Sequence, residues 1–215
     1  MNKKILISLA ASILIMPHAI AGQGNKDSHI YGQVEGGIGG AEGRVFINRD
    51  LLDYTSRLPD ETTVSPSFAL RLGYERGLAH NWLWAIEAGY FYHGNTKKTI
   101  QNSASTLSIK QNGGDLLAVI KKQFDNGFNI YGKAGAAFVH QNLDLHGLIA
   151  APVLGVTSHE IRPEIIAGAG YKISENLETN LSYSHIFAHD IQVSSNNTQV
   201  MSSSSLNLGL RYNFD

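Results

Sequence analysis

Ser184, His185 and Asp190 are the residues of this chain whose types could build a catalytic centre. A serine beside an imidazole base, with a carboxylate to orient that base, is the composition of a hydrolytic nucleophile. The order of the residues argues against this chemistry, because adjacent residues of a strand point to opposite faces and Ser184 would diverge from His185. No further catalytic motif accompanies them, so we predict that the protein is not an enzyme and has no catalytic residues.

Histidines are the second group of residues whose side chains could do chemistry, because several of them fall at or beyond one end of the predicted strands. These are His93, His140, His146, His159, His185 and His189. Imidazoles gathered there could bind zinc or copper, or become charged together as the pH falls toward about 6. His185 and His189 are four residues apart, which on a strand is about 13 Å, so the helical pairing of metal ligands does not apply. We predict scattered surface histidines with no metal and no cofactor, and keep metal binding or pH sensing as the alternative.

The N-terminal segment indicates the compartment. Two lysines precede an apolar stretch over residues 5–16, and Ala19-Ile20-Ala21 matches the small-x-small pattern that signal peptidase reads. A membrane anchor needs roughly 20 apolar residues, and Pro17 interrupts this shorter stretch. We therefore predict a secretory signal peptide over residues 1–21 and a single domain over residues 22–215.

Composition excludes several classes of protein. The chain has no cysteine, which rules out a disulfide framework, a thiolate metal site and the lipid-modified cysteine of a lipoprotein. Its 17 basic and 18 acidic residues give a formal net charge of −1, so there is no case for nucleic-acid binding.

Eight segments alternate apolar and polar residues and predict strands. They cover residues 29–38, 67–76, 82–92, 115–124, 128–138, 162–172, 177–187 and 205–214. Long and short connections between these segments alternate along the chain. The long ones are 39–66, 93–114, 139–161 and 188–204, and the short ones are 77–81, 125–127 and 173–176. Tight turns on one side and long loops on the other are typical of a transmembrane β-barrel.

Alternation alone does not say which face points outward. A secreted soluble barrel of the lipocalin type would use the same alternation with its apolar face inside. Two features favour an outward apolar face here. Aromatic residues on the apolar parity gather near both strand ends, as two bilayer interfaces require, and glycines on the polar parity are mixed with charges, which fits a narrow lumen.

The C-terminal segment, residues 207–214, is the third such feature. It resembles the terminal signal of outer-membrane proteins, with Gly209 followed by alternating apolar and aromatic residues; the trailing Asp215 departs from that pattern. By this resemblance, Gly209, Tyr212 and Phe214 would be read by the barrel-assembly machinery.

The chain as a whole resembles the outer-membrane protein A-like, porin-like family of small surface proteins. The phrases that carry the resemblance are Asn129-Ile130-Tyr131-Gly132-Lys133-Ala134-Gly135, Arg162-Pro163-Glu164, Ala167-Gly168-Ala169-Gly170-Tyr171 and Leu181-Ser182-Tyr183-Ser184-His185. Together with the loop rhythm, it implies an all-β, eight-stranded antiparallel up-and-down transmembrane β-barrel with four long outer loops and three short periplasmic turns. Such a barrel would lie in the cell outer membrane, in contact with membrane lipid and lipopolysaccharide.

Charged side chains occupy the lumen if the polar parity faces inward. Desolvating an unpaired ion costs several kcal/mol, so these groups should pair with one another. We predict a lumen salt-bridge network of Glu35, Arg71, Glu75, Glu87, Lys133, Arg162, Glu164 and Arg211, with Glu178 as a further lumen acid. A hairpin centred near Ala79 would place Arg71 across from Glu87. We also expect Lys121 in the lumen and Lys122 at the periplasmic edge.

Eight strands enclose a lumen that side chains can fill, so a wide diffusion channel is not expected. We expect a structural and surface-interaction role: envelope integrity, adhesion or ligand binding through the outer loops of a surface antigen. The expected partners are membrane lipid and lipopolysaccharide, the barrel-assembly machinery and a host or environmental surface ligand. A narrow porin-like channel for small solutes is the alternative, and an outer-membrane lipid-modifying enzyme is a further one.

Overall fold

The computed structural model describes residues 28–42, 45–49, 52–56, 65–99, 106–146, 155–187, 190–193, 196–199 and 202–214. The predicted signal peptide, residues 1–21, lies outside the described residues.

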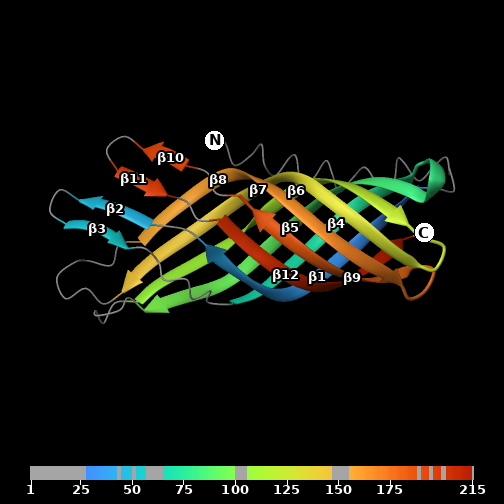
Figure 1. Ribbon diagram of the computed structural model, residues 1–215, viewed down its shortest axis with the longest axis horizontal. Coiled ribbons are helices and arrows are strands. Elements are labelled where there is room, and N and C mark those ends of the chain that lie inside the picture. The colour runs from blue at the N-terminus through green and yellow to red at the C-terminus, as the bar shows by residue number, and fades with distance from the viewer. Residues whose placement is uncertain are drawn as a thin grey trace.

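Eight strands close into one barrel in which every strand is antiparallel to both neighbours (Figure 1). These strands are β1 (Ser28–Glu42), β4 (Ser65–Gly77), β5 (Trp82–Thr99), β6 (Thr106–Gln123), β7 (Phe128–His146), β8 (Gly155–Lys172), β9 (Leu177–Ile186) and β12 (Ser202–Phe214). Each pairs with the next along the chain, and β1 closes the barrel by pairing with β12. The predicted all-β, eight-stranded up-and-down barrel is confirmed.

Two small hairpins add to the barrel at the end that carries the long connections. They are β2 (Val45–Arg49) with β3 (Leu52–Ser56), and β10 (Asp190–Val193) with β11 (Asn196–Gln199). Figure 1 shows both hairpins at one end of the barrel, where β11 contacts β2. The sequence did not predict these strands, because they lie inside segments expected to be plain loops.

The barrel strands reach further toward the long-connection end than the sequence indicates. β5 to β8 have 18 or 19 residues each, whereas β9 has 10. The β7–β8 ladder begins at Asp144 and Gly155, but β8 pairs with β9 only from Glu164 onward. The rim is therefore tall over β5–β8, which we call the tall wall, and low at β9.

The first short turn sets the register between β4 and β5. It contains the one-turn 3-10 helix η1 (Ala79–Asn81), with His80 at φ 62° and Asn81 at φ 60°. Leu78 N–H donates to the carbonyl of Trp82 at 2.7 Å, and the strand pairs are centred on residue 80, not on residue 79. Moving the centre by one residue moves every cross-strand partner by two.

The two faces of the wall differ as the parity predicts. Leu208 is 64% exposed on the outside, whereas Arg71 is 3% exposed and Glu87 is fully buried inside. Exposed aromatic side chains on the outer face flank this apolar band at both ends. Those near the short turns include Trp82, Phe128, Tyr171 and Phe214, and those near the long connections include Phe68, Tyr90, Tyr92, Phe138, Tyr183 and Phe187. The predicted outward apolar face is confirmed. Within the part of the chain that the structure describes, no helical segment has the length and apolarity to cross a bilayer.

Candidate functional site: a charged lumen

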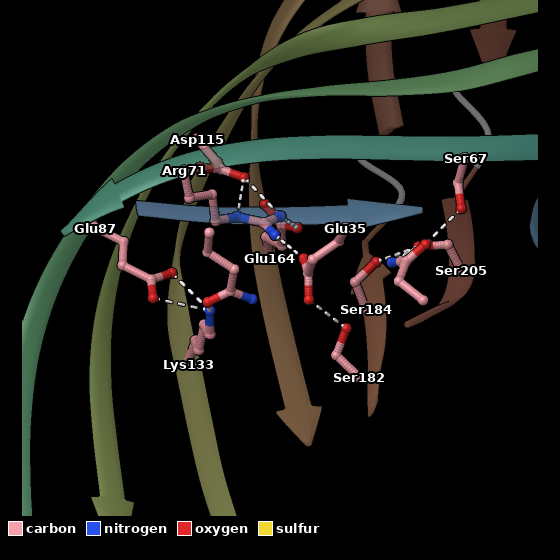
Figure 2. Close-up of polar contacts among 12 residues, drawn as sticks. Glu35, Ser67, Arg71, Glu87, Asp115, Lys133, Glu164, Ser182, Ser184 and Ser205 are labelled. Carbon is pink, nitrogen blue, oxygen red and sulfur yellow. Dashed lines mark hydrogen bonds and ion pairs between the residues drawn. The ribbon is translucent and has the colours of Figure 1, made fainter. Parts of the chain in front are cut away.

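Arg71 of β4 is the centre of the charged network inside the barrel (Figure 2). Its Nη1 binds Oε2 of Glu35 on β1. Its Nε and Nη2 lie 3.0 and 2.9 Å from Oδ2 of Asp115 on β6. Nη2 also lies 3.9 Å from Oε1 of Glu164 on β8. One guanidinium, with five N–H donors in a fixed plane, thus connects four strands across the lumen.

Lys133 and Glu87 form a second pair beside the first. Lys133 Nζ lies 2.7 and 2.9 Å from the two carboxylate oxygens of Glu87, and 3.3 Å from Oε1 of Gln33. The hydroxyl of Tyr31 donates to Glu87 Oε1 at 2.6 Å. Glu87 therefore receives one cation and one neutral donor in the buried interior, which offsets the cost of removing its charge from water.

Glu75 organises a third cluster toward the short-turn end. Arg211 Nη2 lies 2.8 Å and His29 Nε2 3.1 Å from its Oε1, and Lys121 Nζ lies 3.3 Å from its Oε2. Lys121 also lies 3.3 Å from Glu178 Oε2. The side chains of this cluster come from β1, β4, β6, β9 and β12. Its ion pairs therefore connect five of the eight barrel strands across the lumen.

Arg162 lies nearer the long-connection end. Its Nε donates to Oε2 of Glu160 at 3.1 Å, and its Nη2 donates to Oε1 of Gln141 at 3.0 Å. A run of small hydroxyls and an amide continues the polar lining on the β9–β12 side, where Ser184 and Ser205 lie 2.7 Å apart.

Glycines on the inward parity make room for the large lumen side chains. A Cβ on Gly73 would lie 2.3 Å from Cζ of the Tyr31 ring, and a Cβ on Gly89 would lie 2.5 Å from Cγ of Arg71. The tyrosine ring and the arginine stem thus lie directly against bare backbone, which is the physical reason for the small residues among the charges.

The structure places all eight predicted network residues in the lumen. It brings together Glu35, Arg71 and Glu164, pairs Glu87 with Lys133, and pairs Glu75 with Arg211. Arg162 donates to Glu160 and Gln141, which lie outside the predicted set. Lys121 points inward as expected, and Lys122 at the edge donates to the carbonyl of His80.

The predicted contact between Arg71 and Glu87 is wrong. Arg71 lies opposite Gly89, and Glu87 lies opposite Gly73, because the turn is centred one residue later than we placed it. In the observed register, Arg71 forms ion pairs with Asp115 and Glu35, and Glu87 forms an ion pair with Lys133.

Asp115, Tyr31 and Gln33 are network residues that the sequence reasoning missed. The signal was present, since Asp115 shares the parity of Lys121, and Tyr31 and Gln33 share that of Glu35. Applying the inward parity to every polar residue, with the uncharged ones and those of the fourth strand included, would have found them.

Ser184 and His185 diverge, as the alternation predicts. Ser184 points into the lumen toward Ser205, whereas His185 points outward and its Nδ1 lies 2.9 Å from Oγ of Ser204. The two side chains do not share a proton, so they do not form a nucleophile with its base. Asp190 lies in the β10 hairpin strand.

The histidine side chains that the structure describes are not brought into one cluster. Among the described residues, no group of three or more histidine, aspartate or glutamate side chains is arranged to hold a metal ion. His93 is buried at the lumen side of β5, and His140 faces His159 on the outer surface. His189 lies outside the described residues.

The three residues of the predicted assembly signal lie on the last strand. Gly209 faces the lumen, where a Cβ would lie 2.7 Å from Cγ of Glu35. Tyr212 and Phe214 face outward beside the short-turn end, with ring centroids 5.3 Å apart. Their reading by the assembly machinery stays a prediction.

Comparison with known families agrees with this architecture. The family model described as outer membrane protein beta-barrel domain matches residues 6–214. The chain belongs to this family. The outer-membrane barrel accordingly lies in the cell outer membrane, with its apolar face toward lipid and the short turns in the periplasm.

Individual relatives of the outer-membrane barrel are distant. An uncharacterized protein of Coxiella burnetii is 28% identical over 166 residues, which cover 64% of this chain and 65% of that protein. The chain thus spans about 65% of the length of this curated relative.

Solved structures similar to the outer-membrane barrel include three bacterial proteins. Neisserial surface protein A is 13% identical, with a TM-score of 0.46 over 87% of this chain and 99% of that one. Ail, the attachment invasion locus protein of Yersinia pestis, is 13% identical, with a TM-score of 0.44 over 86% and 99%. OprG of Pseudomonas aeruginosa is 15% identical, with a TM-score of 0.48 over 86% and 97%.

Proposed function

We propose that this barrel is a plugged outer-membrane scaffold that supports envelope integrity and presents its outer segments for adhesion or ligand binding, without catalysing a reaction. The observation that supports it is the cluster around Arg71, where side chains from four strands meet across the lumen and bind one another. An eight-stranded barrel has a lumen narrow enough for side chains to fill, so such a cluster closes the path that a diffusion channel would need.

The outer end supplies the interaction surface in this proposal. The tall wall and the two hairpins lie on the side opposite the short turns, which for this family is the outside of the cell. Loops on a rigid barrel can change without loss of the fold, so binding partners are set there. The partners we propose are membrane lipid and lipopolysaccharide around the wall, the barrel-assembly machinery during insertion, and a host or environmental surface ligand at the outer end.

Planar-bilayer recording tests the plugged lumen. We expect the purified barrel to give no stable open-channel steps. We expect the double variant Arg71→Ala, Asp115→Ala to give open-channel steps, because it removes the centre of the lumen cluster. Lys122→Ala, at the periplasmic edge, is the matched control and should behave as the unchanged protein. Stable open steps from the unchanged barrel would favour the narrow porin-like channel and would overturn the proposal.

Whole-cell binding tests the outer surface. Three variants replace residues 43–64, 147–154 or 188–201 by short Gly-Ser linkers and leave the barrel strands intact. Cells that display the intact protein are compared with cells that display each variant, on panels of extracellular-matrix proteins, glycans and lipopolysaccharide. We expect one or more replacements to abolish a binding event of the intact protein.

Mass spectrometry of lipid A from cells with and without the protein tests the enzymatic alternative. A changed acylation pattern would contradict the non-catalytic proposal.

A further inference from the structure

His140 on β7 and His159 on β8 lie directly opposite each other in the sheet. Both belong to the outward parity, since the next outward pair toward the short turns is formed by the exposed Phe138 and Ile161. The two histidines therefore stand on the outer surface of the tall wall, one step above the lipid-facing band. Directly opposed residues of antiparallel strands bring their Cβ atoms to about 4.5–5.5 Å, which allows two imidazoles to meet.

The two rings converge on their Nδ1 edges. The Nδ1 atoms are 3.2 Å apart, whereas the ring centroids are 4.4 Å apart with an interplanar angle of 44°. A zinc ion binds imidazole nitrogen at about 2.0–2.1 Å, and two ligands of a tetrahedral ion at that distance lie about 3.3–3.4 Å from each other. The spacing of the two nitrogens is thus close to that of two ligands of one ion, with no rearrangement of the strands.

We propose that His140 and His159 form a two-histidine site for a divalent transition metal ion, zinc or copper, on the outer surface of the barrel. Imidazole nitrogen is a ligand that both ions favour. Each histidine binds through Nδ1 and keeps its proton on Nε2. The two remaining positions of a tetrahedral ion point away from the wall, where water completes the coordination.

The metal-free pair holds one proton between the two nitrogens, because one neutral ring donates its Nδ1–H to Nδ1 of the other. Metal binding requires the donating ring to move its proton from Nδ1 to Nε2, so both Nδ1 atoms can bind the ion and the neutral pair releases no net proton. Protonation of either ring competes with the ion. The apparent affinity should therefore be weaker in acid, because protons and the ion compete for the same ring nitrogens. Two protein ligands, in a described structure without a larger cluster, make this an exchangeable site and not a structural metal centre.

Isothermal titration calorimetry with zinc chloride tests the site. The barrel is purified through an affinity tag that contains no histidine, folded in detergent micelles, and titrated at pH 7.5 and pH 5.5. We expect one zinc ion to bind per barrel at pH 7.5, and at least tenfold weaker binding at pH 5.5. His140→Asn and His159→Asn should each weaken binding at least tenfold.

His185→Asn is the matched control, because His185 also faces outward on a strand near the long-connection end but its Nδ1 lies 2.9 Å from Oγ of Ser204. It should leave zinc binding unchanged. Electron paramagnetic resonance of the copper-loaded barrel gives a second readout, with nitrogen couplings from two imidazoles in the unchanged protein and from one in His159→Asn. The two Asn variants alter surface side chains and test the site independently if either one folds poorly. Zinc binding of equal strength in the unchanged barrel and both Asn variants, or no binding by the unchanged barrel, would overturn the proposal.

Discussion

Arg71 holds Asp115 through two of its nitrogen atoms, with Nε at 3.0 Å and Nη2 at 2.9 Å from the same carboxylate oxygen. The two residues lie 44 positions apart, on β4 and β6, with β5 between them in the wall. Gly89 of β5 has no side chain to separate them, since a Cβ there would lie 2.5 Å from Arg71 Cγ and 2.7 Å from Asp115 Oδ1.

Removal of Arg71 should destabilise the barrel by about 3–5 kcal/mol, because it leaves Asp115 and Glu35 buried without their cation. Adding Asp115→Ala to Arg71→Ala should recover part of that loss, with a coupling free energy above about 1 kcal/mol. Urea unfolding in lipid vesicles measures each variant. The Arg71/Glu87 cycle is the comparison and should give a smaller coupling; strictly additive effects at Arg71 and Asp115 would contradict the contact.

Glu164 should contribute less than the other acids of the same cluster. It approaches Arg71 only at 3.9 Å, and its Oε2 has no hydrogen-bond partner among the described residues. An imperfectly paired buried charge repays little of its desolvation, so Glu164→Gln should change the free energy of unfolding by less than about 1 kcal/mol or stabilise the barrel. Glu35→Gln, which weakens a direct bond to Arg71, should cost more in the same unfolding assay. Equal losses for the two variants would contradict this ranking.

Gly73→Ala should destabilise the barrel by about 1–3 kcal/mol, the usual cost of forcing an extra methyl into a packed interior. The new Cβ would lie 2.3 Å from Cζ of Tyr31, whose hydroxyl donates to Glu87. Gly36→Ala is the control, because no atom lies within 4 Å of its added Cβ. It should fall within about 0.5 kcal/mol of the unchanged protein. Urea unfolding measures both variants, and the midpoint of Gly73→Ala should lie below that of Gly36→Ala. The reverse order would contradict the prediction.

Leu208→Arg should cost about 2–4 kcal/mol, because Leu208 is exposed on the lipid-facing side of β12. Ser204→Arg, on the same face near the outer end of that strand, should cost about 0–1 kcal/mol, since the penalty falls toward the interface. Unfolding from lipid vesicles measures both. If the two substitutions were equally harmless, the outer face of the wall would not be in contact with lipid.

Phe214→Ala should lower the amount of barrel inserted in cells while leaving refolding of the purified chain nearly unchanged. Phe214 is exposed, pairs with Ile30 across the closing seam, and contributes no side chain to the lumen network. A loss of recognition by the assembly machinery can therefore be distinguished from a loss of barrel stability. Outer-membrane fractionation measures insertion, and urea midpoints measure stability. Ile130→Ala, an exposed lipid-facing change near the same end of β7, controls for loss of apolar surface. A parallel loss of insertion in both variants would argue against a signal.

Alternation of side chains made the barrel predictable, because a strand with lipid on one face and a polar lumen on the other must change character at every residue. The same physics explains where the prediction fails. Above the lipid both faces of a strand meet polar surroundings, so the outer end of β5, which includes Lys97 and Lys98, carries no such pattern, and the sequence predicts a connection there.

The charged residues of the lumen followed from parity, but their pairings did not. A partner depends on the register of each strand pair, and the turn at His80 and Asn81, both with positive φ, moved the β4–β5 register by two residues. Contacts across the lumen, such as Arg71 with Glu164, depend in addition on the tilt and closure of all eight strands. Neither quantity can be read from one segment of sequence.

The uneven lengths of the strands make the outer end of the barrel asymmetric. The strands β5 to β8 have 18 or 19 residues each, whereas β9, which is the neighbour of β8, has 10. A ligand at this end therefore meets a continuous sheet over β5–β8, and the β2–β3 and β10–β11 hairpins elsewhere on the rim (Figure 1).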